Sequence, residues 1–185
     1  SLCDSPAWVP GDTNGVQLDP NVEKIAQVIM PAIMETWEAE DDRTAAIEIC
    51  QSFASCLNKC GPGLISPQWI EPTCQLTMQI LEKKAPSQID PEADEDEETE
   101  DSSEYESVLI SAAMDLVGAM AYVLCDSFMT PMRQFLPLLC KYYSPGRSVT
   151  DRATAIGSLG EITVNMKRAI TPFTCLLYTS PSPRD

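Results

Sequence analysis

Three cysteines stand close together in the first half of the chain, and thiolates at short spacings are typical ligands of zinc. They are Cys50, Cys56 and Cys60, the last two one helical turn apart. Structural zinc sites use four ligands in paired spacings, often with histidine, and this sequence has no histidine. We therefore predict buried thiols on a packed helix, with no metal site and no bound cofactor.

The absence of histidine also bears on catalysis. It excludes Ser-His and Cys-His nucleophilic pairs within this chain. No glycine-rich phosphate loop follows a strand pattern. The sequence thus predicts a binding protein with no catalytic residues, not an enzyme.

A second group of side chains with a possible function is a block of acidic residues. Ten acidic residues and no basic ones fall between Asp90 and Glu104, in a chain whose net charge is −16. Such a run repels itself and stays solvated, so we expect a disordered loop. Its field attracts basic partners and repels nucleic acids and anionic membranes, and we expect no apolar run long enough to span a bilayer. We assign the binding of a basic partner to Asp94, Glu95, Asp96, Glu97, Glu98, Glu100 and Asp101.

The elements around this block repeat. The segments "DDRTAAIEICQSF" (41–53) and "TDRATAIGSLGEI" (150–162) both open with an Asp-Arg pair, 109 residues apart. Ala113 and Gly118 align with Ala155 and Gly160 at an offset of 42. The offset from Ala46 to Ala113 is 67, so the acidic block is an insertion into one repeat.

Each repeat contains two helical patterns. Val108, Ala112, Leu116 and Met120 share one helical face. Three other apolar runs, 29–37, 69–77 and 134–142, each carry an early proline, and Ser66–Pro67 and Thr130–Pro131 predict helix starts with a Ser or Thr cap. A helix pair every forty or so residues, opened by Asp-Arg, predicts an all-α HEAT-repeat solenoid of stacked antiparallel pairs.

The chain then divides by composition. The predicted parts are an irregular stretch (1–19), HEAT repeats (20–85), the acidic inter-helix loop (86–104), further HEAT repeats (105–174) and a foreign tail (175–185). The tail "CLLYTSPSPRD" matches one translated frame of a sequencing adapter, so we expect it not to be native.

Two long runs carry a family resemblance. "YESVLISAAMDLVGAMAYVLCDSF" (105–128) and "FLPLLCKYYSPGRSVTDRATAIGSLGEI" (135–162) resemble the central part of importin-beta (karyopherin-beta) nuclear transport receptors, and within them the importin-four branch. The likeness extends over about residues 20–174. It implies a monomeric superhelix that wraps basic cargo such as histones and ribosomal proteins. Release by Ran-GTP, contact with Phe-Gly nucleoporins and shuttling between cytoplasm and nucleus are further implications.

In such arrays the second helix of each pair lines the concave side. An indole beside carboxylates suits the stem and head of a Lys or Arg, so Glu35, Trp37 and Glu38 are predicted cargo contacts. The Asp-Arg pairs are predicted to link neighbouring repeats. The repeat signature also fits another class of protein, a HEAT scaffold that organises a different complex.

Overall fold

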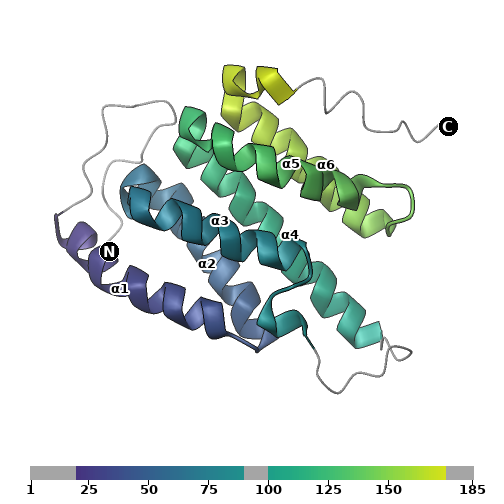
Figure 1. Cartoon of the computed structure of the whole chain (residues 1–185), viewed down its shortest axis with the longest axis horizontal. Helices are drawn as coiled ribbons and strands as arrows, with labels where there is room; N and C mark the ends of the chain where they lie inside the picture. The colour runs from purple at the N-terminus through teal and green to yellow at the C-terminus, as the bar shows by residue number, and fades with distance from the viewer. Residues whose placement is uncertain (1–19, 90–99, 174–185) are drawn as a thin grey trace.

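A computed structural model describes residues 20–89 and 100–173 of the chain (Figure 1). Its six α-helices are α1 (Pro20–Ala39), α2 (Arg43–Cys60), α3 (Pro67–Leu81), α4 (Glu100–Leu124), α5 (Met129–Tyr143) and α6 (Val149–Met166). Four short 3-10 helices connect or end them: η1 (Gly61–Leu64), η2 (Pro86–Gln88), η3 (Cys125–Phe128) and η4 (Lys167–Phe173). Within these two described ranges there is no strand.

The helices form two layers. The first helices of the repeats lie side by side in the order α2, α4, α6, and the second helices in the order α1, α3, α5 (Figure 1). Within the first layer α4 packs most extensively on α2 and α6. The predicted all-α HEAT-repeat solenoid is confirmed.

The Asp-Arg pair sets the start of α2. Asp42 is the N-cap residue, and its Oδ1 accepts a hydrogen bond of 2.8 Å from the backbone N–H of Ala45. At the other end, Gly61 has a φ of 71°, a conformation that glycine adopts without steric cost, and its N–H donates to the carbonyl of Leu57. Local sequence alone thus determines both ends of this helix.

The predicted prolines lie inside the second helices, as Pro31, Pro72 and Pro137. The predicted caps are less accurate. Ser66 is at the N-cap position of α3 but its side chain makes no capping bond. The prediction for Thr130 is wrong, because Phe128 is the N-cap residue and Thr130 already lies in the first turn of α5.

The core of the fold is centred on α4. Leu109, Met114, Leu116 and Met120 are fully buried there. The stretch Glu104–Tyr143 contains a helical segment that is long enough and apolar enough to cross a membrane, judged by length and composition alone. This corrects the expectation that no apolar run reaches that length. Because 67% of this segment is buried in the fold, its apolar character matches that of a core helix enclosed by α2 and α6.

The acidic insertion is shorter at both ends than the predicted 86–104. Residues 86–88 form η2, and α4 begins at Glu100. The apolar pattern that predicts the helix start says nothing of its first turn, where acidic side chains are favoured by the helix dipole. The segment 90–99 lies outside the described residues.

Candidate functional site

The predicted acidic contacts divide into two groups. Asp94, Glu95, Asp96, Glu97 and Glu98 lie outside the described residues. Glu100 and Asp101 belong to the first turn of α4, although their side chains are not described. The acidic block as a binding element therefore stays a prediction.

The three predicted contacts on α1 differ in exposure. Glu35 and Glu38 are exposed, but Trp37 is only 4% exposed. Its ring meets that of Phe53 edge to face, with 6.5 Å between the ring centroids. The assignment of Trp37 to a ligand is therefore corrected: this indole packs α1 against α2.

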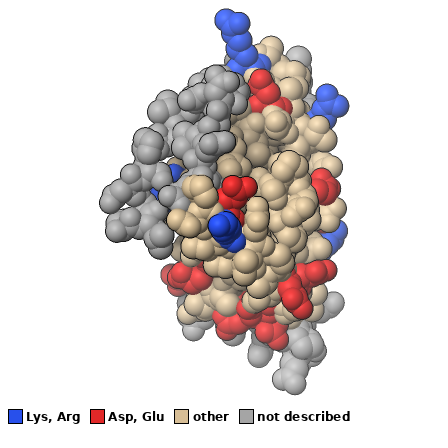
Figure 2. All heavy atoms as spheres, turned by 90° about the vertical axis from the view of Figure 1, so that its left-hand side faces the viewer, with Lys and Arg blue, Asp and Glu red and all other residues tan. Residues whose placement is uncertain are grey.

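Further acids lie close to Glu35 and Glu38, where α1 ends and α2 begins. We call Glu35, Glu38, Glu40 and Asp41 the acidic corner. Glu40 Oε1 accepts a hydrogen bond of 3.1 Å from the N–H of Asp42, and the carboxylate of Asp42 is used as the cap of α2. In Figure 2 acidic side chains gather at the lower end of the face that α1 and α2 present. Of these four, only Glu35 and Glu38 are among the predicted cargo contacts; Glu40 and Asp41 lie in the short connection between α1 and α2.

The second-helix layer changes charge along its length. Beyond the acidic corner, α3 exposes Glu71, whose Oε1 accepts a bond of 3.1 Å from Gln75 Nε2. Next in the layer, α5 exposes Arg133 and Lys141 and carries no acid. One side of this layer thus offers carboxylates and the other offers cations.

The six cysteines of the described residues do not form a binding centre. Cys50 is fully buried, and burial raises the pKa of its thiol to about 12. Burial, and then the charge of Glu71, raise the pKa of Cys74 to about 12. Cys56 is exposed, contrary to the expectation that the thiols of this helix are buried. In the described ranges no group of three His, Cys, Asp or Glu side chains is arranged to hold a metal ion.

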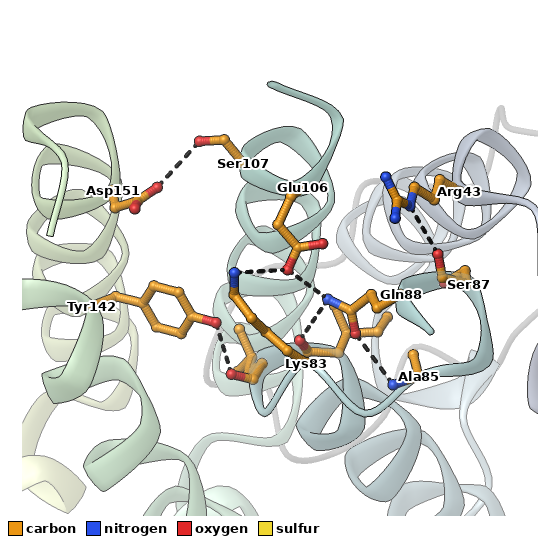
Figure 3. A network of polar contacts seen from close by, with 11 residues as sticks. Arg43, Lys83, Ala85, Ser87, Gln88, Glu106, Ser107, Tyr142 and Asp151 are labelled. Carbon is orange, nitrogen blue, oxygen red and sulfur yellow. Dashed lines mark hydrogen bonds and ion pairs between the residues drawn. The ribbon is translucent and has the colours of Figure 1, made fainter. Parts of the chain in front are cut away.

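A network of polar contacts ties the start of α4 to its neighbours, and we call it the polar junction (Figure 3). Glu106 Oε1 lies 3.4 Å from Lys83 Nζ and accepts a hydrogen bond of 3.0 Å from Gln88 Nε2. The same Gln88 Nε2 donates to the carbonyl of Ile80 at 3.1 Å. Residues on both sides of the acidic block are thereby fixed, since Gln88 precedes it and Glu106 follows it.

The junction extends to the neighbouring repeats. Arg43 Nε donates to the carbonyl of Ser87 at 3.0 Å, and Ser107 Oγ donates to Asp151 Oδ1 at 3.1 Å. The buried hydroxyl of Tyr142 donates to the carbonyl of Leu81 at 2.7 Å. The bond between Ser107 and Asp151 links neighbouring repeats, as predicted for the Asp-Arg pairs. Arg43 instead bonds to the segment that follows α3, within its own helix pair. The small cavity here, about 100 Å³, lies among groups already bonded to one another.

Comparison with known proteins finds three relatives, all of which are named as importins. The chain is 32% identical over 181 residues to probable importin subunit beta-4 of Schizosaccharomyces pombe, which covers 94% of the chain and 17% of that relative. It is 27% identical over 166 residues to importin-4 of Mus musculus, covering 86% of the chain and 15% of the relative. Importin-4 of Homo sapiens matches 147 residues at 26% identity, 78% of the chain and 14% of the relative.

No family model matches the chain. The chain spans less than a fifth of the length of each of these curated relatives. The resemblance expected from the runs 105–128 and 135–162 is nevertheless confirmed, because the matched regions cover most of the chain.

Proposed function

Because the chain belongs to the importin-beta family, as a homologue of one segment of importin-4 proteins, we propose that it forms part of a nuclear import receptor. In this proposal it binds basic cargo such as histones and ribosomal proteins and has no catalytic activity. The whole receptor moves between cytoplasm and nucleus, contacts Phe-Gly nucleoporins and releases its cargo when Ran-GTP binds.

The observation that carries the proposal is the charge change along the second-helix layer. Glu35 and Glu38 on α1 and Glu71 on α3 are exposed on neighbouring helices. The acidic block attaches at the far end of α3, beyond η2. A Lys- and Arg-rich segment laid across α1 and α3 therefore meets carboxylates, whereas α5 would repel it through Arg133 and Lys141.

Exposed carboxylates of this kind strengthen binding through their number, because each one contributes little to the affinity. A single exposed ion pair contributes about 0.2–1 kcal/mol and is screened by salt. Three such pairs, at about 0.5 kcal/mol each, change affinity about tenfold. We therefore expect weak individual contacts that add up over a flexible cargo segment.

The test is binding of a histone-tail-like basic peptide to the chain at near-physiological salt. One variant replaces the carboxylates on α1 and α3, by Glu35→Gln, Glu38→Gln and Glu71→Gln. A second replaces the acids of 90–104 by Ser and Asn. The matched control, Arg133→Gln with Lys141→Gln, alters exposed charges of the same layer but of opposite sign. Circular dichroism first establishes that every variant is helical.

We expect the first variant to lose about tenfold in affinity and the control to bind as well as the original or better. A larger loss in the second variant assigns most of the affinity to the acidic block. If the folded original chain does not bind the peptide, the cargo role of this segment is refuted, and the alternative of a HEAT scaffold for another complex is favoured.

A further inference from the structure

The prolines of the second helices give the layer of α1, α3 and α5 a common register. Pro31, Pro72 and Pro137 lie inside three helices that run in the same direction (Figure 1). When the helices are aligned on these prolines, residues at equal distances from them form rows across the layer, which we call proline rows. Because α1 contacts α3 and α3 contacts α5, each proline row has three members on neighbouring helices.

The proline row that lies four residues after the prolines reverses its charge across the layer. Its members are Glu35 of α1, Leu76 of α3 and Lys141 of α5. Glu35 and Lys141 are exposed, and Leu76 is half-buried. A segment that lies along this row therefore meets a carboxylate, an apolar side chain and an ammonium group in that order.

Two further proline rows each contain one charged residue, and both charges follow the same order. From α1 to α5, the members are Gln27, Gln68 and Arg133 in the row four residues before the prolines, and Glu38, Gln79 and Ser144 in the row seven residues after them. All are exposed except Ser144, which is half-buried. In these three rows the acids thus lie on α1, the cations lie on α5, and the members from α3 are neutral.

The proline rows stay open in the middle of the layer. α3 has a second helix on each side, yet Gln68 and Gln79 are exposed and Leu76 is only half-buried. A neighbouring second helix therefore does not cover these rows. Their exposure on α1 and α5 thus follows from the side of the layer on which they lie, not from the place of these helices in the chain.

The two cations of α5 differ from a lysine at the end of α3. Lys83 Nζ lies 3.4 Å from Glu106 Oε1, so its charge is already paired within the fold. Among the described residues Arg133 and Lys141 form no ion pair. A carboxylate of a ligand would therefore meet two cations that no carboxylate of the fold neutralises, about 12 Å apart along the helix.

The width of the layer sets the length of a segment that reaches both charges. Axes of packed helices lie about 8–10 Å apart, so α1 and α5 are separated by about 16–20 Å across α3. An extended chain rises about 3.3 Å per residue. A segment therefore needs about six residues to pass from the acids of α1 to the cations of α5.

We propose that this layer binds a cargo segment with separated charges, in which basic residues over α1 and acidic residues over α5 are about six positions apart. The inference rests on the proposed function and deepens it, because it names the class of cargo segment and its orientation. Glu35 and Glu38 attract the basic end, and the two cations of α5 attract the acidic end. Acidic residues directly beside the basic ones would instead lie near α1 and weaken binding.

The test compares three peptides of equal length on the whole chain at near-physiological salt. The basic peptide carries a block of lysines in a neutral Gly-Ser sequence. The separated peptide adds two glutamates about six positions from the lysines, and the adjacent peptide has the same glutamates directly beside them. Fluorescence anisotropy of labelled peptides measures the affinities.

Each peptide is measured with the original chain and with two variants that circular dichroism shows to be helical. One variant, Arg133→Gln with Lys141→Gln, removes the cations of α5. The matched control, Lys59→Gln with Arg168→Gln, also removes one exposed lysine and one exposed arginine, but these lie in α2 and η4, outside the layer.

We expect the original chain and the control to bind the separated peptide about fivefold more tightly than the basic peptide. The variant without the cations of α5 should lose this gain, and the adjacent peptide should bind more weakly than the basic one. The gain should also shrink as salt is added, because exposed ion pairs are screened.

The outcomes separate this inference from the proposed function. If the basic peptide binds and the separated peptide binds no better, the inference is overturned and the proposed function stands. A gain that persists without the cations of α5 also overturns it. Binding of the separated peptide alone, dependent on Arg133 and Lys141, would support the order of charges and contradict binding of cargo that is only basic. If no peptide binds the folded chain, both are refuted.

Discussion

α4 and α2 hold equivalent places in the repeat, yet among the described residues α4 has a first helix on both sides, α2 and α6, and α2 has one only on the side of α4. Equivalent residues show the effect, since Leu116 is fully buried and Ile49 is half-buried. The enclosed helix uses Ala119 and Val123 where the helix at the edge has Ser52 and Cys56. In a solenoid each helix is stabilised by its nearest neighbours, so position in the stack decides how much a residue contributes to stability.

The largest expected effect comes from truncating the matched leucine and isoleucine. Leu116→Ala should lower the free energy of unfolding by about 2–5 kcal/mol, because it leaves a cavity in a closed interface. Ile49→Ala should cost less, about 1 kcal/mol, because part of that side chain is already in water. Urea unfolding of both variants measures the difference. Equal losses would mean that the face of α2 is as covered as that of α4.

The matched glycines should give a smaller difference. Gly118→Leu should destabilise by about 1–3 kcal/mol, because a large side chain must displace Glu161 and the face of α6. Gly160→Leu meets open space and should be neutral or stabilising, by up to about 1 kcal/mol from helix propensity. Thermal unfolding of the two variants measures the difference. Destabilisation by Gly160→Leu would show that the space around Gly160 is filled in solution.

The smallest effect concerns two carboxylates that face each other across α4 and α6. Burial, and then the charge of Glu161, raise the pKa of Asp115. A carboxyl group with a raised pKa in the folded state favours folding when protonated, and this contribution is lost as the pH rises through the folded value. At neutral pH the charged Asp115 therefore lowers stability.

Asp115→Asn should accordingly raise the free energy of unfolding at pH 7 by up to about 0.5 kcal/mol. The gain should shrink as the pH falls through the raised pKa of Asp115, and it should disappear once Asp115 is protonated in both the folded and the unfolded state. The control is Glu48→Gln at the equivalent position of α2, where the residue matching Glu161 is Ala119. A gain that persists in acid would rule out charge repulsion as the cause.

The architecture is predictable from the sequence because the same helix-pair pattern recurs several times along the chain. Asp42–Arg43 and Asp151–Arg152 mark equivalent helix starts, and the prolines mark the second helices. The predicted start of α4 is five residues late, since apolar spacing carries no information on a polar first turn. The cap predicted at Thr130 rests on the preference of Thr–Pro for helix starts, but the 3-10 turn η3 leads directly into α5.

The site is less predictable, because exposure depends on neighbours that are distant in sequence. Trp37 is followed by Glu38, which suggests a surface position. Its spacing from Met30 and Met34 is that of a buried helical face, and this signal favours the core. The contact with Phe53 on the next helix cannot be read from α1 alone. The polar junction cannot be predicted from local sequence either, because Gln88 and Glu106 form a hydrogen bond although the acidic insertion separates them in the chain.

The prolines of the second helices have a mechanical consequence for the whole array. Pro31, Pro72 and Pro137 each lack the N–H that would close a helical turn, so the layer of α1, α3 and α5 has one weakened turn in every member. The helices α2, α4 and α6 contain no proline, so no backbone N–H donor is missing from their helical hydrogen bonds. The solenoid thus has one stiff layer of helices, α2, α4 and α6, and one more flexible layer, α1, α3 and α5. We expect its curvature to change mainly by stretching or compressing the layer that contains the prolines.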